Sequence, residues 1–275
     1  MSKYVCLAAV LALSSMGAVA QSAKATAAIN TAVWCTYSTS TSGDVSGIPT
    51  VSSCVNLFTG AQIVPTPDKF IPIMTTSMKV SNSQSLFVTP SLVAGLYTNT
   101  AVKSKTSGGT GSTSQAVGMG AVYLRAVLRD PNNSDPATNV VSVAYPVEEC
   151  SIIDAEGGTA PLGCEQTPNG EWGVVLDSRI QTLSQTLSGC TVSTGGTCSF
   201  DLTTQLILQT ASAHTFAFIF PNVGVGTYNV SIEAAVDSSA NTSTTNGGAY
   251  AVGASAFGLG SVTVESVRLV HGFSF

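Results

Sequence analysis

The sequence has few charged residues. Of its 275 residues, 9% are Asp, Glu, Lys or Arg, and the formal net charge is −5. About a quarter of the residues in an average soluble domain are charged, so we expect a weakly charged surface rich in hydroxyl groups. The largest basic cluster is Lys103 with Lys105. Because nucleic acids and anionic membranes are recognised by basic patches, we expect neither as a partner.

Several patterns of catalytic and metal-binding residues are also missing. The two histidines, His214 and His271, cannot supply a His-rich zinc or copper site. The chain has no C-x-x-C redox pair, and after residue 20 no Ser has a Gly both two positions before and two positions after it. The segment 130–135 alternates oxygen ligands as a calcium loop does, but it lacks the Gly and the distal Glu of such loops. We therefore predict no metal, no cofactor and no assignable catalytic residue.

The first 20 residues have the pattern of a secretory signal. Lys3 precedes an apolar stretch over Val5–Leu13, and Ala18 and Ala20 supply the small side chains of a cleavage site before Gln21. After residue 20 no apolar run approaches the roughly 20 residues that a membrane helix needs. We therefore expect a secreted, extracellular chain of residues 21–275 without a transmembrane segment.

Six cysteines follow the predicted signal. An even number of cysteines in a secreted chain favours disulfide bonds. Six cysteines allow 15 connectivities, and the spacing favours pairing between neighbours along the chain, although it does not exclude the others. The expected pairs are Cys35 with Cys54, Cys150 with Cys164, and Cys190 with Cys198.

Alternation of apolar and polar residues dominates the rest of the chain and predicts an all-β fold. We expect an antiparallel β-sandwich, immunoglobulin-like or jelly-roll-like, with disulfide-stapled loops, in a single large domain over 21–275. Two sandwiches with a seam near 130–138 are the alternative. The expected strands are Ala61–Val64, Ile73–Val80, Ser85–Val88, Val93–Thr98, Ala121–Arg129, Asn139–Tyr145, Trp172–Thr182, Thr204–Gln209, His214–Phe220, Tyr228–Val236, Ala249–Phe257 and Ser261–Val270.

Four segments have a less certain pattern. Lys103–Gln115 and Ser238–Gly248 are rich in Ser, Thr and Gly, and their composition predicts mobile loops because they offer little apolar surface to bury. Gln181–Leu187 fits a helical turn as well as a strand. Ala25–Val33 fits a short helix or a first strand.

A strand pair near the C-terminus resembles a feature of immunoglobulin-like sandwiches. Phe216, Phe218 and Phe220 share one face of a strand that a Gly-rich corner joins to an alternating run beginning at Tyr228. The pattern resembles the E-to-F corner of that superfold, in which the Tyr hydroxyl bonds back across the corner. The run SVTVESVRLV, from Ser261 on, is similar to its terminal G strand. The resemblance covers about a fifth of the chain and implies a fold without implying a function.

The same alternation places His214 beside these phenylalanines. We therefore expect its side chain to lie in the core as a neutral imidazole with a backbone partner. A role as a general base would require a partner that is not close in sequence.

Two groups of residues are candidates for a site. Glycoside hydrolysis requires two carboxyl groups facing each other across roughly 5–10 Å, and four acidic residues near the second cysteine pair could supply them: Glu148, Glu149, Glu171 and Asp177. Alternation places Asp177 on one face with Arg179, which also predicts a simple outward ion pair. A carbohydrate-binding face would instead use exposed aromatic rings beside amide and hydroxyl groups, and three aromatic residues fall outside the clearest core pattern: Trp34, Tyr37 and Tyr97.

The leading hypothesis is a secreted, non-enzymatic β-sandwich protein that binds glycan or another protein at a cell surface or in an extracellular matrix. A secreted carbohydrate-active enzyme that uses two of the four carboxylates is the alternative. A subunit of a surface fibre is a third hypothesis, in which an N-terminal strand from Ala25–Val33 would dock on a neighbouring subunit.

Overall fold

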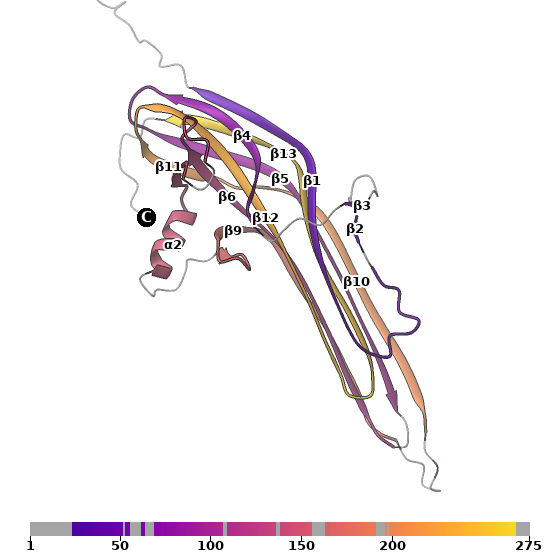
Figure 1. Ribbon diagram of the computed structural model, residues 1–275. Coiled ribbons are helices and arrows are strands. Elements are labelled where there is room, and N and C mark those ends of the chain that lie inside the picture. Colours follow the sequence, from indigo (N-terminus) through magenta and orange to yellow (C-terminus); the bar gives the residue numbers. More distant parts are fainter. Residues whose placement is uncertain are drawn as a thin grey trace, which may run out of the picture.

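The fold is a sandwich of two antiparallel β-sheets, as the alternation in the sequence predicts (Figure 1). The computed structural model describes residues 24–51, 53–55, 62–63, 69–106, 109–135, 138–155, 163–190, 196 and 198–267. The predicted signal segment 1–20 lies outside the described residues. Among those residues, no helix has the length and the hydropathy that a membrane span requires.

Each sheet combines strands from both halves of the chain. The first sheet has the order β1 (Ala25–Gly43), β13 (Gly247–Val267), β5 (Gln84–Thr106) and β10 (Phe200–Thr215), and β11 (Phe218–Val223) also pairs with β5. The second sheet has the order β4 (Ile71–Val80), β12 (Gly226–Thr244), β6 (Ser112–Arg129), β9 (Trp172–Leu187) and β8 (Cys164–Gln166), and β7 (Val140–Val143) also pairs with β6. Two further elements complete the described fold: a ribbon of β2 (Cys54–Val55) with β3 (Gln62–Ile63), and the helix α2 (Val147–Ala155).

The strands are much longer than the expected ones. β5 has 23 residues and β13 has 21, which corresponds to about 70 Å of extended chain. Each of them joins two segments that we expected to be separate strands. Figure 1 shows the long strands running from a broad upper end into a narrow lower end.

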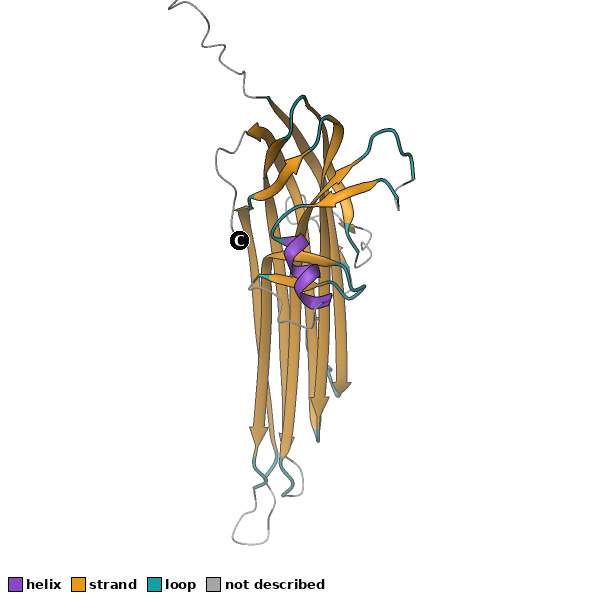
Figure 2. Ribbon diagram, turned by 90° about the vertical axis from the view of Figure 1, so that its left-hand side faces the viewer, coloured by secondary structure: helices purple, strands orange, loops and turns teal. Residues whose placement is uncertain are grey.

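We call the broad end, with β4, β7, β8, β11 and α2, the head. We call the narrow end the stalk, and it consists of residues 37–43, 97–106, 112–120, 181–187, 200–209, 238–244 and 247–253. In Figure 2 the helix α2 lies on the outside of the strands in the upper half of the molecule.

The head has a core of large apolar side chains. Val122, Leu124, Ala126 and Leu128 of β6 lie at alternate positions and face the first sheet across the sandwich. Burying such side chains removes roughly 25 cal/mol of unfavourable free energy per Å² of apolar surface. The largest buried side chains of this core are Phe218, Phe220, Phe257, Leu86, Leu92, Leu96, Leu124, Leu128 and Ile232.

The stalk is filled by small and polar side chains instead. Val102, Ala116, Ala249 and Ala251 form its small apolar cluster. A Cβ atom on Gly253 would collide with carbonyl oxygens of the second sheet, so the two backbones are in direct contact there. The sheets therefore approach more closely than the 10 Å or so that larger side chains impose.

Both segments that we expected to be loops are largely strands, so that prediction was wrong. Lys103–Gln115 contains the end of β5 and the start of β6, and Ser238–Gly248 contains the end of β12 and the start of β13. Their hydroxyl groups bond between the sheets, as Ser38 does with Ser238 and Ser40 with Thr242. The open alternatives are also decided, because Ala25–Val33 lies in β1 and Gln181–Leu187 lies in β9, both as strands.

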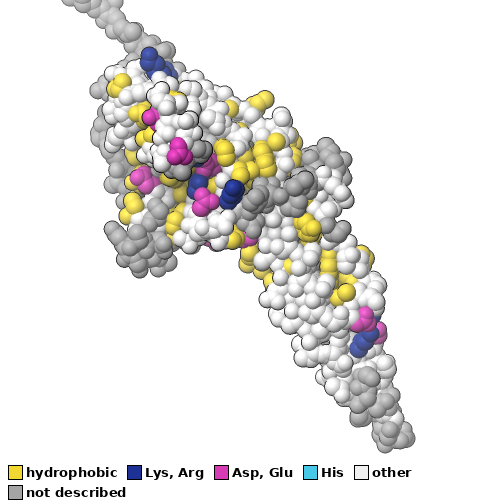
Figure 3. Space-filling model, in the orientation of Figure 1, with side chains coloured by type: hydrophobic (Ala, Val, Ile, Leu, Met, Phe, Trp, Pro, Cys, Tyr) yellow, Lys and Arg dark blue, Asp and Glu magenta, His cyan; other side chains and the backbone are white. Residues whose placement is uncertain are grey.

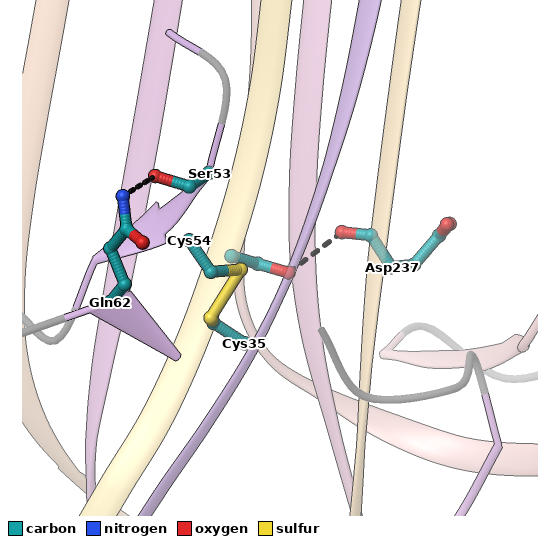
Figure 4. The surroundings of a disulfide bond; sticks show 6 residues. Cys35, Ser53, Cys54, Gln62 and Asp237 are labelled. Carbon is teal, nitrogen blue, oxygen red and sulfur yellow. Dashed lines mark hydrogen bonds between the residues drawn. A yellow bond between two sulfur atoms is a disulfide. The ribbon is translucent and has the colours of Figure 1, made fainter. Parts of the chain in front are cut away.

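The predicted local pairing of the cysteines is confirmed. The Cα atoms are 6.2 Å apart in Cys35–Cys54, 6.2 Å in Cys150–Cys164 and 5.7 Å in Cys190–Cys198. Figure 4 shows the first bridge, with Ser53 and Gln62 hydrogen-bonded to each other beside it. This bridge ties β2 to β1 on the outside of the first sheet.

The corner after β11 carries the chain from the first sheet to the second. Gly224 and Gly226 flank it, and the ring of Tyr228 lies so close to Gly226 that a Cβ atom there would crowd it. The Tyr228 hydroxyl lies 3.7 Å from the position that a Cβ on Gly224 would take. Membership of the immunoglobulin-like superfold stays a prediction.

Candidate functional site

Two tyrosines lie in one row across the outer face of the first sheet. Tyr37 of β1 is opposite Ala254 of β13, and Ala254 is opposite Tyr97 of β5. Cys35 shares the parity of Tyr37 and bonds to Cys54, which lies outside the sandwich, so this parity faces outward. Both tyrosines are half-buried. Their backbones are two strand spacings apart, about 10 Å, and the residue between them in the row, Ala254, has a small side chain.

Amide and hydroxyl groups continue the row. Gln209 of β10 is opposite Tyr97, and Asn99 lies two residues further along β5 on the same face. The Gln205 amide nitrogen donates to the Asn99 side-chain oxygen at 3.0 Å. Burial raises the pKa of the Tyr97 hydroxyl, and a hydrogen bond with Asn99 opposes that rise. We call this set the tyrosine face, and its members are Tyr37, Tyr97, Asn99, Gln205, Gln209 and Ala254.

The segment after β1 supports the tyrosine face from one side. The Val51 N–H donates to the Tyr250 hydroxyl at 2.6 Å, and Ile48 packs against Tyr250. Tyr97 packs against the same cluster, and Tyr37 packs against the Cys35–Cys54 bridge. The two rings are therefore held by neighbours rather than free to rotate.

The third predicted aromatic residue lies elsewhere. Trp34 precedes Cys35, so its side chain faces the opposite side of the sheet. It packs against the head core and stacks on Phe257 with 5.2 Å between the ring centroids. The structure thus brings together Tyr37 and Tyr97 but not Trp34.

The four candidate carboxylates divide between separate surroundings. Glu148 and Glu149 lie in the first turn of α2, and burial raises the pKa of Glu148. Glu171 precedes β9, where one carboxylate oxygen contacts the Arg125 guanidinium at 3.1 Å and the other accepts from the Phe70 N–H at 3.2 Å. Both oxygens of Glu171 are therefore occupied by structural partners.

Asp177 contacts the one histidine that the structure describes. Its Oδ2 atom lies 3.4 Å from Nε2 of His214, and the Ser212 hydroxyl lies 2.6 Å from the same nitrogen. A Ser-His-Asp relay needs the hydroxyl and the carboxylate on different ring nitrogens. The arrangement is therefore a contact between the carboxylate and the imidazole ring, with a hydroxyl neighbour, rather than an activated nucleophile.

Two expectations about this region were wrong, for two physical reasons. His214 has the inward parity that we inferred, but β10 is an edge strand and the side chain is 32% exposed. Asp177 was expected to face outward, but β9 has a register shift that leaves Leu176 without a partner on β6. A bulge of this kind reverses the parity of the residues after it, so Asp177 turns toward the first sheet.

That reversal creates a ladder of polar side chains between β9 and β10. Asp177 contacts His214, Arg179 donates to the Thr210 hydroxyl at 2.8 Å, and the Gln181 amide donates to the Leu206 carbonyl at 2.7 Å. Among these groups Gln181 is buried. The ladder joins the two sheets along an edge where their backbones do not pair.

Sequence reasoning missed a buried charge cluster on the outer face of the second sheet. Glu233 of β12 is 1% exposed and binds both Arg125 and Arg129 of β6. The Arg125 guanidinium also lies 4.2 Å from the centroid of the Phe70 ring. Arg125 and Arg129, which have the same parity within the apolar half of β6, were the signal that could have revealed it. The charges are mutually satisfied, which fits a structural role.

The surface of the molecule carries little charge on the face that Figure 3 shows. Figure 3 shows a face on which most atoms belong to uncharged polar side chains or to the backbone, with a few charged side chains between them. The described residues contain no group of three metal-ligating side chains. Comparison of the chain with family models, with curated proteins and with solved structures finds no significant match.

Proposed function

We propose that the chain is a secreted, non-catalytic protein that binds glycan through the tyrosine face. The observation that carries the proposal is the row Tyr37, Ala254 and Tyr97, in which two half-buried rings flank a residue with a small side chain. Sugar rings present apolar C–H faces and peripheral hydroxyl groups. Aromatic rings contact the former, and amide groups such as those of Gln205 and Gln209 bond the latter.

The surroundings of two of the four candidate carboxylates, Glu171 and Asp177, support binding over hydrolysis by that pair. Glu171 is held by Arg125 and by a backbone N–H, and Asp177 is held by His214. A general acid needs a carboxyl group that can exchange protons with a bound substrate. The three disulfides are typical of an oxidising compartment, which supports secretion.

A glycan array probed with residues 21–275, followed by titration of the best ligand, tests this proposal. We expect Tyr97→Ala and Tyr37→Ala each to weaken binding by about 5-fold to 150-fold, because a stacked ring contributes roughly 1–3 kcal/mol. Tyr97→Phe keeps the ring and should retain most of the affinity. Ile29→Ala is the control, since Ile29 lies on β1 with Tyr37 and is exposed outside the tyrosine face.

Two results would contradict the proposal. One is a ligand whose affinity does not change in the Tyr37→Ala, Tyr97→Ala double variant. The other is hydrolysis of a polysaccharide that Glu171→Gln or Asp177→Asn abolishes while the fold is retained, which would favour the enzymatic alternative.

A further inference from the structure

The strand β10 forms a long open edge of the first sheet. It pairs with β5 over its whole length, from Phe200 opposite Thr106 to Thr215 opposite Ser91, without a register shift. Among the described strands β5 is its one backbone neighbour. β9 approaches it through side chains. An open edge of 16 residues leaves a row of N–H and C=O groups available to another strand.

The usual protections of an edge strand are missing from β10. Natural edges are blocked by Lys, by Pro, by bulges or by shortness, and β10 has none of these. Its titratable residues are Asp201 and His214, near its two ends. The middle of the strand carries exposed apolar side chains, and its central residue, Ile207, is 51% exposed. The exposed large apolar residues of β10 are Phe200, Leu202, Leu206, Ile207 and Leu208.

The parity of the strand shows which groups face the open edge. Just beyond β10 the Phe216 N–H donates to the Pro90 carbonyl at 3.1 Å, in the same register. In an antiparallel ladder, alternate residues bond to the same neighbour. The even-numbered residues of β10 therefore bond to β5, and the odd-numbered residues from Asp201 to Ala213 point their N–H and C=O groups outward.

The sequence of β10 is a palindrome about one of these outward residues. Residues 204–210 read TQLILQT, with Ile207 at the centre. If two copies of the strand pair antiparallel about Ile207, each side chain of this segment meets its own kind: Leu206 faces Leu208, Gln205 faces Gln209, and Thr204 faces Thr210. Cross-strand pairs of apolar side chains and of hydroxyl groups are favourable, and no like charges oppose each other.

We propose that the partner of this edge is a second copy of the chain, paired β10 to β10 about a two-fold axis through Ile207. The two backbones of Ile207 exchange both hydrogen bonds, and the odd-numbered residues continue the ladder on either side. The order β1, β13, β5, β10 then continues into β10, β5, β13, β1 of the other copy. The contact is isologous, so it closes as a dimer and does not propagate.

The dimer has a consequence that rests on the proposed function. A two-fold axis that relates antiparallel neighbours in one sheet is perpendicular to that sheet, so both copies present the same face on the same side. Gln209, next to Tyr97, lies on the strand at the junction. Two tyrosine faces would thus lie side by side, and a repeating glycan could bind both with an avidity greater than either affinity.

Analytical ultracentrifugation of residues 21–275 over a range of concentrations tests the dimer without reference to any ligand. We expect a monomer–dimer equilibrium. Ile207→Lys places two ammonium groups opposite each other and should raise the dissociation constant by about 100-fold. Ile29→Lys, at an apolar residue of β1 that is 78% exposed, is the matched control and should leave the equilibrium unchanged.

A second pair of variants tests the backbone contact itself. Ala211 is exposed and odd-numbered, so Ala211→Pro removes an outward N–H while the bonds to β5 remain. It should weaken the dimer, whereas Ala211→Ser should not. Circular dichroism checks that each variant keeps its strands.

Three outcomes would overturn the proposal. A protein that stays monomeric at every concentration has no such contact. A dimer that Ile207→Lys and Ala211→Pro leave unchanged uses another surface. Open-ended filaments would show that β10 pairs with a different strand. Loss of glycan binding in a protein that still dimerises would count against the proposed function and not against the dimer.

Discussion

The head and the stalk use the same strands but different interiors. In the head, Leu, Ile, Val, Met and Phe side chains separate the two sheets. In the stalk, Ala, Gly, Ser and Thr occupy the corresponding positions, and glycines bring backbone against backbone. The thickness of a sandwich is thus set by the side chains between its sheets. One continuous strand can pass from a thick apolar layer into a thin polar one.

Side-chain hydrogen bonds join the two sheets along both edges of the stalk. Ser38, Ser40 and Ser42 of β1 bond to Ser238 and Thr242 of β12 along one edge of the stalk. Along the other edge Gln181 of β9 bonds to Leu206 of β10, and the contacts of Asp177 and Arg179 continue this ladder from the stalk toward the head. We infer that side-chain hydrogen bonds compensate in the stalk for the apolar burial that it lacks.

The largest expected effect comes from truncating a side chain in the head. Phe220 is fully buried, so Phe220→Ala should lower the free energy of unfolding by about 3–5 kcal/mol through lost burial and the resulting cavity. Phe200→Ala removes the same ring from the stalk, where it is 57% exposed, and should cost less than about 0.5 kcal/mol. Urea denaturation measures both, and equal effects would mean that Phe220 does not lie in a packed core.

The second largest expected loss of stability comes from replacing a glycine of the stalk with a larger residue. A Cβ on Gly253 would collide with the carbonyl oxygens of Met119 and Ser239. Gly253→Val must therefore push the sheets apart and should destabilise by about 1–3 kcal/mol or more. Ala211→Val adds carbon to the exposed edge of the same sheet and serves as the control. A stalk that accepts Gly253→Val without loss of thermal stability would show that the sheets are not in contact.

Removing the buried amide of the stalk tests the role of its hydrogen bonds. The Thr98 hydroxyl donates to the Gln181 side-chain oxygen at 2.7 Å, and the Gln181 nitrogen donates to the Thr100 hydroxyl at 2.6 Å and to the Leu206 carbonyl. Gln181→Ala removes the side-chain partner of both threonine hydroxyls and should cost about 1–3 kcal/mol.

Hydrogen exchange of β10 amides should increase in Gln181→Ala, because the ladder holds that strand to β9. Gln209→Ala, at an exposed amide of β10, should change neither the stability nor the exchange. Identical exchange in the two variants would mean that Gln181 does not tether β10.

The smallest expected effect is a dependence of stability on alkaline pH. Burial, with the nearby charges of Asp237 and Glu165, raises the pKa of Tyr123 to about 12 from its usual 10.0. The folded chain therefore keeps a proton that the unfolded chain loses, and stability should fall as the pH rises from about 10 to about 12. Tyr123→Phe should reduce this dependence, and the melting temperature at the two ends of the range measures it. An unchanged slope would mean that Tyr123 is not the group responsible.

The sequence predicted the head better than the stalk. Alternating Val, Leu and Phe residues place the core strands correctly, because burial of one face requires that period. The cysteine pairs were also predictable from their short spacing. Ser238–Thr244 has the composition of a loop, but it pairs as a strand with Ser114–Gly120 of β6. Its hydroxyl partners in β1 lie some 200 residues away in sequence. The local amino-acid composition therefore cannot predict such partners.

The candidate site was predictable in its chemistry but not in its geometry. Tyr37 and Tyr97 could be named, but their shared row depends on the register of β1 and β5 against β13. The side of the sheet that Asp177 faces depends on the bulge at Leu176, and no residue type in β9 predicts that bulge. The pair of arginines bound by Glu233 needed the register of β12 against β6.

The direction of the long strands also bears on how the molecule responds to force. β1, β5, β6, β12 and β13 each extend from the head into the stalk (Figure 1). Ladder hydrogen bonds lie across the strands, so tension applied between the two ends loads many of them in shear at once. A pull sideways on one strand would instead open them one after another. If the head is attached to a surface and the stalk to a ligand, the chain transmits load along its stiffest axis.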